Sequence, residues 1–158
     1  MLKKLLIIPL FSLSLFGVEI VIDKSSAFVE PSTTFTRDDK KETVSDSATG
    51  LMWQDDESAK SGKKVGKEAQ AYCKALSFAD HSDWFLPSLE QLESIVDIKR
   101  YNPSIDITFK NTVSSNYWSS TGYADNSNVA WHVDFKDGSS SRRHKTFDFY
   151  VRCARAGQ

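Results

Sequence analysis

The sequence predicts a single α+β domain with two helices and a mostly antiparallel sheet. Apolar residues between positions 65 and 78 recur at the spacing of one helical face, and a second helix start follows Pro87. The C-terminal part alternates apolar and polar residues, which is typical of strands with one buried face. The two helices therefore lie near the middle of the chain, and the sheet is drawn from both ends.

The first 17 residues have the three parts of a secretion signal. Lys3 and Lys4 supply positive charge, residues 5–16 form a short apolar run, and Gly17 is a small residue suited to cleavage. The apolar run is shorter than the about 20 residues of a membrane-spanning helix. We expect residues 1–17 to be removed, which leaves a periplasmic or secreted protein without a membrane span. The alternative is an uncleaved N-terminal anchor.

Net charge and length limit the class of protein that the chain after residue 17 can be. Cleavage would remove two lysines and no acidic residue, which shifts the formal net charge from −1 to −3. This balance argues against a nucleic-acid-binding protein, which normally carries a basic excess. About 140 residues would remain, enough for one domain with its own core. We expect a linker or outlying strand at residues 18–34 and the folded domain at residues 35–158.

The elements before the helices are short. Thr43 and Val44 are predicted to be extended, residues 48–50 have turn chemistry, and residues 51–53 enter the core. Residues 55–67 are polar and rich in lysine, which indicates a solvated loop.

Two helices follow this loop. The first is predicted at about residues 65–78, and its apolar stripe contains a cysteine. The members of the stripe are Val65, Ala69, Tyr72, Cys73 and Leu76. The second helix begins with a capping box, in which Ser88 is followed three residues later by Gln91.

The remaining elements are strands, at residues 116–121, 130–135 and 147–153. Period-two alternation predicts which side chains face the core. The inward set is Trp131, Val133, Phe135, Phe147, Phe149, Val151 and Cys153. The wetter set is His132, Asp134, Asp148, Tyr150 and Arg152.

Cys73 and Cys153 are the only cysteines, and both fall on predicted inward faces. Two cysteines in an exported protein usually form a disulfide. A bridge here would fasten the first helix to the C-terminal strand. The alternatives are two free buried thiols, or a metal-binding or catalytic cysteine.

An ordered set of aromatic landmarks spans most of the chain. It consists of residues 46–54, 71–73, 83–88, 92, 95–97, 102–103, 105–106, 117–121, 130–135 and 151–155. This succession resembles the DUF1566 family, also called the Lcl C-terminal domain family after a collagen-like adhesin, over about residues 44–155. The resemblance implies a C-type-lectin-like fold, distantly related to formylglycine-generating enzymes, in which a helix cysteine pairs with one in the last strand. Phe85 departs from the family pattern, which usually has arginine there.

The sequence motifs give little support for an enzyme or for a metal-binding protein. A formylglycine-generating enzyme needs two reactive cysteines close together in its C-terminal part, and only Cys153 lies there. His132 and Asp134 point the same way from one strand, but a solvated sheet face explains them more simply. The oxygen-rich residues 125–128 lack the spacing of a calcium-binding loop and are ordinary turn residues. We expect no catalytic residue, metal or cofactor.

Candidate ligand-binding residues come from one tryptophan and a basic hairpin. Trp53 and Trp131 follow the periodicity of the core, whereas Trp118 precedes polar residues at a loop edge and is the best candidate for a sugar platform. Arg142, Arg143 and Lys145 suit sulfate or carboxylate groups. A second basic cluster is formed by Lys60, Lys63, Lys64 and Lys67. The alternative for both clusters is a solvated surface.

Three functional classes follow from these features. The leading interpretation is an exported, non-enzymatic domain that binds carbohydrate or another cell-surface partner. The second is an envelope enzyme or enzyme accessory built on the same scaffold. The third is a structural envelope component that assembles into an oligomer.

Overall fold

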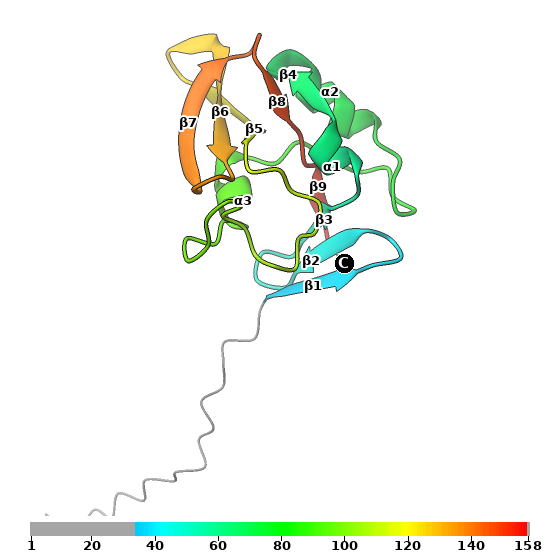
Figure 1. Cartoon of the computed structure of the whole chain (residues 1–158). Coiled ribbons are helices and arrows are strands. Elements are labelled where there is room, and N and C mark those ends of the chain that lie inside the picture. Colours follow the sequence, from blue (N-terminus) through cyan, green and yellow to red (C-terminus); the bar gives the residue numbers. More distant parts are fainter. Residues whose placement is uncertain (1–33, 158) are drawn as a thin grey trace, which may run out of the picture. The chain divides into compact units, whose positions relative to one another are not determined.

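The structure is a computed structural model, and it describes residues 34–157. The predicted signal peptide at residues 1–17 and the segment 18–33 lie outside this range. The described part is an α+β domain, as predicted, with three short helices and nine strands (Figure 1). The strands form two sheets rather than one, so the predicted single sheet is wrong.

The first sheet has four antiparallel strands and joins the two ends of the domain. Its order is β1 (Phe35–Asp38), β2 (Thr43–Asp46), β3 (Leu51–Gln54) and β9 (Ala154–Ala156). The turn between β2 and β3 matches its predicted turn chemistry. Asp46 accepts hydrogen bonds from the Ala48 N–H and the Thr49 hydroxyl, and Gly50 adopts a left-handed φ of 68°.

The second sheet has five strands. Its order is β4 (Lys63–Val65), β8 (Asp148–Tyr150), β5 (Asn116–Tyr123), β6 (Asn126–Asp134) and β7 (Ser139–His144). All pairs are antiparallel except β5 with β8. The chain therefore returns from the edge strand β7 to the interior strand β8, crossing the end of the sheet.

The helices differ from prediction in number and length. They are α1 (Ser58–Ser61), α2 (Gly66–Ala75) and α3 (Leu89–Glu93). The capping box of Ser88 and Gln91 is confirmed, with both reciprocal hydrogen bonds present. The predicted loop at residues 55–67 instead contains α1 and β4. This helix has only Ala59 as a buried residue, so it has no apolar stripe by which sequence could reveal it.

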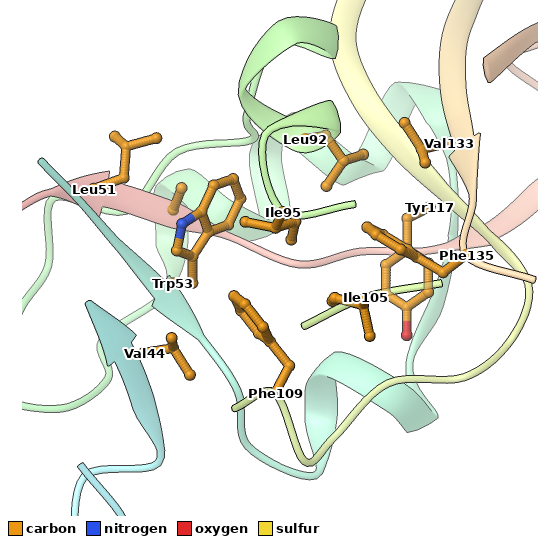
Figure 2. Packing of buried hydrophobic residues seen from close by; sticks show 11 residues of the cluster. Val44, Leu51, Trp53, Leu92, Ile95, Ile105, Phe109, Tyr117, Val133 and Phe135 are labelled. Carbon is orange, nitrogen blue, oxygen red and sulfur yellow. The ribbon is translucent and has the colours of Figure 1, made fainter. Parts of the chain in front are cut away.

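Two apolar clusters form the core. The larger lies between the sheets and α3, and Figure 2 shows its side chains converging around Ile95 and Ile105. The smaller surrounds the disulfide and includes Trp84, Trp118 and Val151. Trp53 is fully buried, as its position in the pattern predicted.

The predicted faces of the last strand are partly wrong. Phe147 was expected to face inward but is 51% exposed, whereas Arg152 was expected on the wetter face and is fully buried. The strand β8 ends at Tyr150, so the period-two pattern does not continue through Arg152. Val151 and Cys153 are buried, as predicted.

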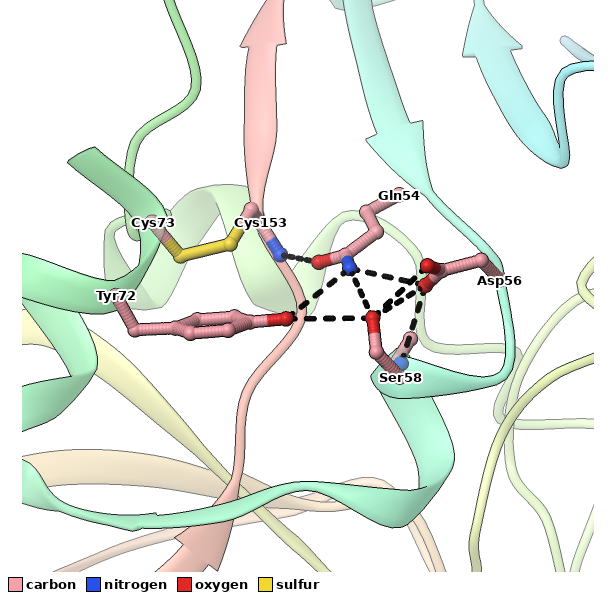
Figure 3. Close-up of a disulfide and its surroundings, with 7 residues drawn as sticks. Gln54, Asp56, Ser58, Tyr72, Cys73 and Cys153 are labelled. Atoms are coloured by element: carbon pink, nitrogen blue, oxygen red, sulfur yellow. Dashed lines mark hydrogen bonds between the residues drawn. A yellow bond between two sulfur atoms is a disulfide. The ribbon is translucent and has the colours of Figure 1, made fainter. Parts of the chain in front are cut away.

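The predicted disulfide is confirmed. Cys73 of α2 is bonded to Cys153, just before β9 (Figure 3). The Cys153 N–H also donates to the Gln54 side chain at 3.2 Å, which fastens the bridge to β3. Such a bond indicates an oxidising, extracytoplasmic location. None of the helices in the described range is long and apolar enough to cross a membrane.

Candidate functional site

The structure brings the two basic segments of the sequence together. Residues 60–67 and 142–145 contain seven lysines and arginines and no acidic residue. The Gly66 N–H donates to the Lys145 carbonyl oxygen at 2.8 Å. A Cβ atom added to Gly66 would lie 3.1 Å from the Lys145 Cα atom, so the two backbones are in direct contact. We use the name basic surface for six cations that these two adjoining segments carry; they are Lys63, Lys64, Lys67, Arg142, Arg143 and Lys145.

Lys145 fixes this arrangement. Its N–H donates to the Asn128 carbonyl at 2.7 Å, and its Nζ donates to the Ser127 carbonyl at 2.8 Å. The segment that follows β7 is thereby held between the β5–β6 hairpin and the start of α2. In Figure 1 it is the orange-red connection that lies between that hairpin and β4.

The cations of the basic surface lack acidic partners. Across residues 34–157, none of these six side chains forms an ion pair with a carboxylate. Lys60, from the predicted cluster, differs because it pairs with Glu57 at 3.0 Å. The positive charge of the basic surface is therefore available to an external anion.

Aromatic rings underlie several of these cations. The Arg142 guanidinium carbon lies 4.6 Å from the Tyr123 ring centroid and 5.9 Å from that of Trp131. The Nζ of Lys63 is 5.0 Å from the Tyr150 ring centroid, and that of Lys64 is 4.9 Å from the Tyr72 ring centroid. Such contacts hold a cation over a ring face and restrict its conformations.

Comparison with known proteins identifies the family of this chain. The sequence profile of the Lcl C-terminal domain matches residues 42–155. The chain belongs to the Lcl C-terminal domain family. No curated protein matches it. Both cysteines and the whole basic surface fall within the part of the chain that the Lcl C-terminal domain covers.

Within this Lcl C-terminal domain, the burial of two tryptophans differs from prediction. Trp118, the predicted sugar platform, is only 1% exposed, and its indole N–H donates to the Lys64 carbonyl at 3.0 Å. A ring so enclosed has no free face, so we place no ligand contact on Trp118. Trp131, predicted to be core, is half-buried beside Arg142. The cluster that buries Val133 on the same strand ends before Trp131.

His132 also differs from its predicted place. It is 4% exposed rather than solvated, and its ring lies 4.7 Å from Phe149 and 6.0 Å from Trp118, between centroids. Burial, and secondarily the nearby charge of Arg143, lowers the pKa of His132 to about 4. Its Nδ1 atom has no hydrogen-bond partner among the described residues. His132 is thus a neutral side chain of the interior.

The oxygen-rich loop has a local structural role. The Asn126 side chain accepts a hydrogen bond from the Asn128 N–H at 2.9 Å, as expected of a turn residue. Throughout residues 34–157, no three His, Cys, Asp or Glu side chains are grouped to hold a metal ion.

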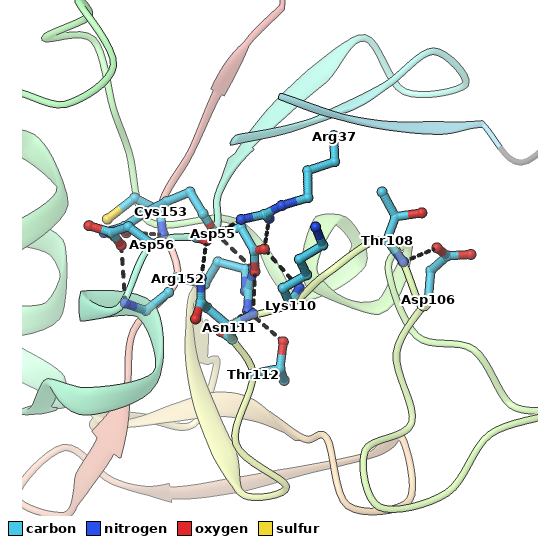
Figure 4. Close-up of polar contacts among 12 residues, drawn as sticks. Arg37, Asp55, Asp56, Asp106, Thr108, Lys110, Asn111, Thr112, Arg152 and Cys153 are labelled. Carbon is cyan, nitrogen blue, oxygen red and sulfur yellow. Dashed lines mark hydrogen bonds and ion pairs between the residues drawn. The ribbon is translucent and has the colours of Figure 1, made fainter. Parts of the chain in front are cut away.

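A buried polar cluster was missed by sequence reasoning. Asp55 is fully buried and accepts hydrogen bonds from Arg152, Arg37 and two backbone N–H groups (Figure 4). Asp55 belongs to the predicted solvated loop, and its partners lie far away in sequence. Every charge in this cluster has a partner inside the protein, so it supports the fold rather than a ligand.

Proposed function

We propose that this Lcl C-terminal domain is a non-enzymatic binding domain, periplasmic or secreted, that recognises anionic carbohydrate at a cell surface. The observation that carries the proposal is the contact between Gly66 and Lys145, which unites two basic segments about 80 residues apart. Neither segment contains an acidic residue.

The charge distribution supports a polyanionic partner. The protein as a whole has a formal net charge of −1, yet the two segments that meet at Gly66 and Lys145 carry six cations that form no ion pair within residues 34–157. A local excess of one sign attracts opposite charge even when the net charge of the protein is near zero. Because these side chains are mostly exposed, added salt should screen the attraction.

The fold and location fit the same proposal. A helix cysteine joined to one beside the last strand supports a C-type-lectin-like scaffold, which the family resemblance implied. A disulfide is maintained in an oxidising compartment, where cell-surface sugars are accessible. Fold alone does not assign a ligand, and the charge of the basic surface is the feature that indicates an anionic one.

The test is binding of the purified protein to a broad glycan array at low and at physiological salt, with and without a chelator. We expect binding to acidic or sulfated glycans that weakens as salt is added and does not depend on the chelator. The double substitution of Arg142 and Arg143 to alanine should remove most of it.

A matched control removes the same charge elsewhere. Lys99 and Arg100 are exposed residues of the connection after α3, and neither belongs to the basic surface. Their double alanine variant should keep binding to the array. A folded protein that binds no anionic glycan, or equal losses in both double variants, would contradict the proposal.

A further inference from the structure

Three side chains at one end of the basic surface form a distinct cluster. Arg142 of β7 lies directly opposite Trp131 in the β6–β7 register, and Tyr123 ends β5. The guanidinium carbon is 4.6 Å from the Tyr123 ring centroid and 5.9 Å from the Trp131 ring centroid. We call these three residues the aromatic–arginine cluster.

The cluster is open to an external ligand. Tyr123 and Trp131 are half-buried, and Arg142 is exposed. In the described part of the chain Arg142 makes no ion pair with a carboxylate. The two rings therefore restrict the guanidinium plane, while its charge remains uncompensated.

The geometry points to a subsite for the carboxylate of an acidic sugar. This inference rests on the proposed function and names the chemical group that this part of the basic surface selects. A guanidinium is a planar fork of N–H donors that pairs with the two oxygens of a carboxylate in one plane. The apolar face of the same sugar ring can pack on the exposed part of Trp131 or Tyr123.

The lysines of the basic surface lack this selectivity. An ammonium group is a point charge on a flexible stem, so it attracts sulfate and carboxylate without a preferred plane. We infer that Lys63, Lys64, Lys67 and Lys145 supply general attraction, whereas Arg142 distinguishes a carboxylated sugar from a sulfated one.

Arg143 is a matched control for Arg142. It is the next residue of the same strand, is also exposed, and points to the opposite side of the sheet because side chains alternate. It makes no cation–π contact with a ring in the described residues. Arg142→Lys and Arg143→Lys both keep the charge and remove the planar fork, but only the first affects the cluster.

The experiment measures affinity for three polymers with the purified protein. Polygalacturonate carries carboxylates on sugar rings, dextran sulfate carries only sulfates on sugar rings, and polyglutamate carries carboxylates without sugar. We expect Arg142→Lys to weaken polygalacturonate binding by about tenfold, which corresponds to about 1.4 kcal/mol. The same variant should change dextran sulfate binding by less than about twofold, and Arg143→Lys should affect both sugars equally.

The outcomes separate this inference from the proposed function. Failure of the unaltered protein to bind either polysaccharide would overturn both. Binding of dextran sulfate alone, or equal effects of the two lysine variants on polygalacturonate, would overturn the carboxylate subsite and leave the proposed function standing. Polyglutamate bound as tightly as polygalacturonate would show that the sugar ring is not recognised.

Discussion

The Asp55 carboxylate and the Arg152 guanidinium form a fully buried ion pair, with 2.7 Å between Oδ1 and the donating nitrogen. The partners are 97 residues apart in the chain. Asp55 follows β3 and Arg152 follows β8, so this pair links the two sheets. Arg152 also donates to the Asn111 carbonyl and the Thr112 hydroxyl, both at 2.7 Å, which connects the long loop before β5.

We expect Asp55→Asn to lower the free energy of unfolding by about 3–5 kcal/mol. The substitution leaves the buried Arg152 charge without its counterion, and that uncompensated charge is the main cost. Denaturant unfolding followed by tryptophan fluorescence measures the loss.

Asp39→Asn is the control for this prediction. Asp39 also pairs with Arg37, but its side chain is 68% exposed, so water replaces the lost partner. The loss should be much smaller than for Asp55→Asn. Equal losses in the two variants would show that the buried ion pair contributes no more to the free energy of unfolding than the exposed pair does.

The disulfide should contribute several kcal/mol to stability. The bonded cysteines are 80 residues apart, and closing a loop of this length removes roughly 4.5 kcal/mol of unfolded-state freedom in the chain-entropy model. Cys73→Ser and Cys153→Ser should each lower the free energy of unfolding by a large part of this amount.

A reductant provides the control for the disulfide. It should lower the stability of the unaltered protein toward that of the serine variants, and it should leave the variants unchanged. A protein purified from its export compartment with two titratable thiols would refute the disulfide as a native feature.

Local patterns predicted the parts of the fold that depend on neighbouring residues. The capping box of Ser88 depends on four consecutive residues, and the buried face of α2 follows from a single helical period. The burial of Arg152 could not be predicted in this way. It depends on Asp55, which only the tertiary fold brings near, and period-two alternation assigns Arg152 to the wrong side.

The candidate site was also predictable only in part, because some of its features are local in the sequence and others depend on the tertiary fold. Arg142, Arg143 and Lys145 stand together in the sequence, so their shared charge is visible there. The contact of this segment with residues 60–67, through Lys145 and Gly66, depends on how the chain crosses from β7 to β8. The pairing of Arg142 with Trp131 depends on strand register, which the alternation of each strand leaves open.

His132 gives a prediction about acid stability. The pKa of His132 falls from an ordinary 6.5 to about 4 in the folded protein, so between these values only the unfolded chain binds this proton. The free energy of unfolding should therefore decrease as the pH falls from 6.5 toward 4. One pKa unit corresponds to about 1.4 kcal/mol, and protonation is incomplete at both ends of this pH interval, so the decrease due to His132 should be roughly 2–3 kcal/mol.

The neutral variant His132→Gln isolates this contribution. Acidic side chains elsewhere titrate in both proteins, so the difference between their stability curves reports His132 alone. We expect the curve of the unaltered protein to fall more steeply than that of the variant between pH 6.5 and pH 4. Parallel curves would mean that His132 accepts its proton without unfolding, and that the enclosure by Trp118 and Phe149 opens readily.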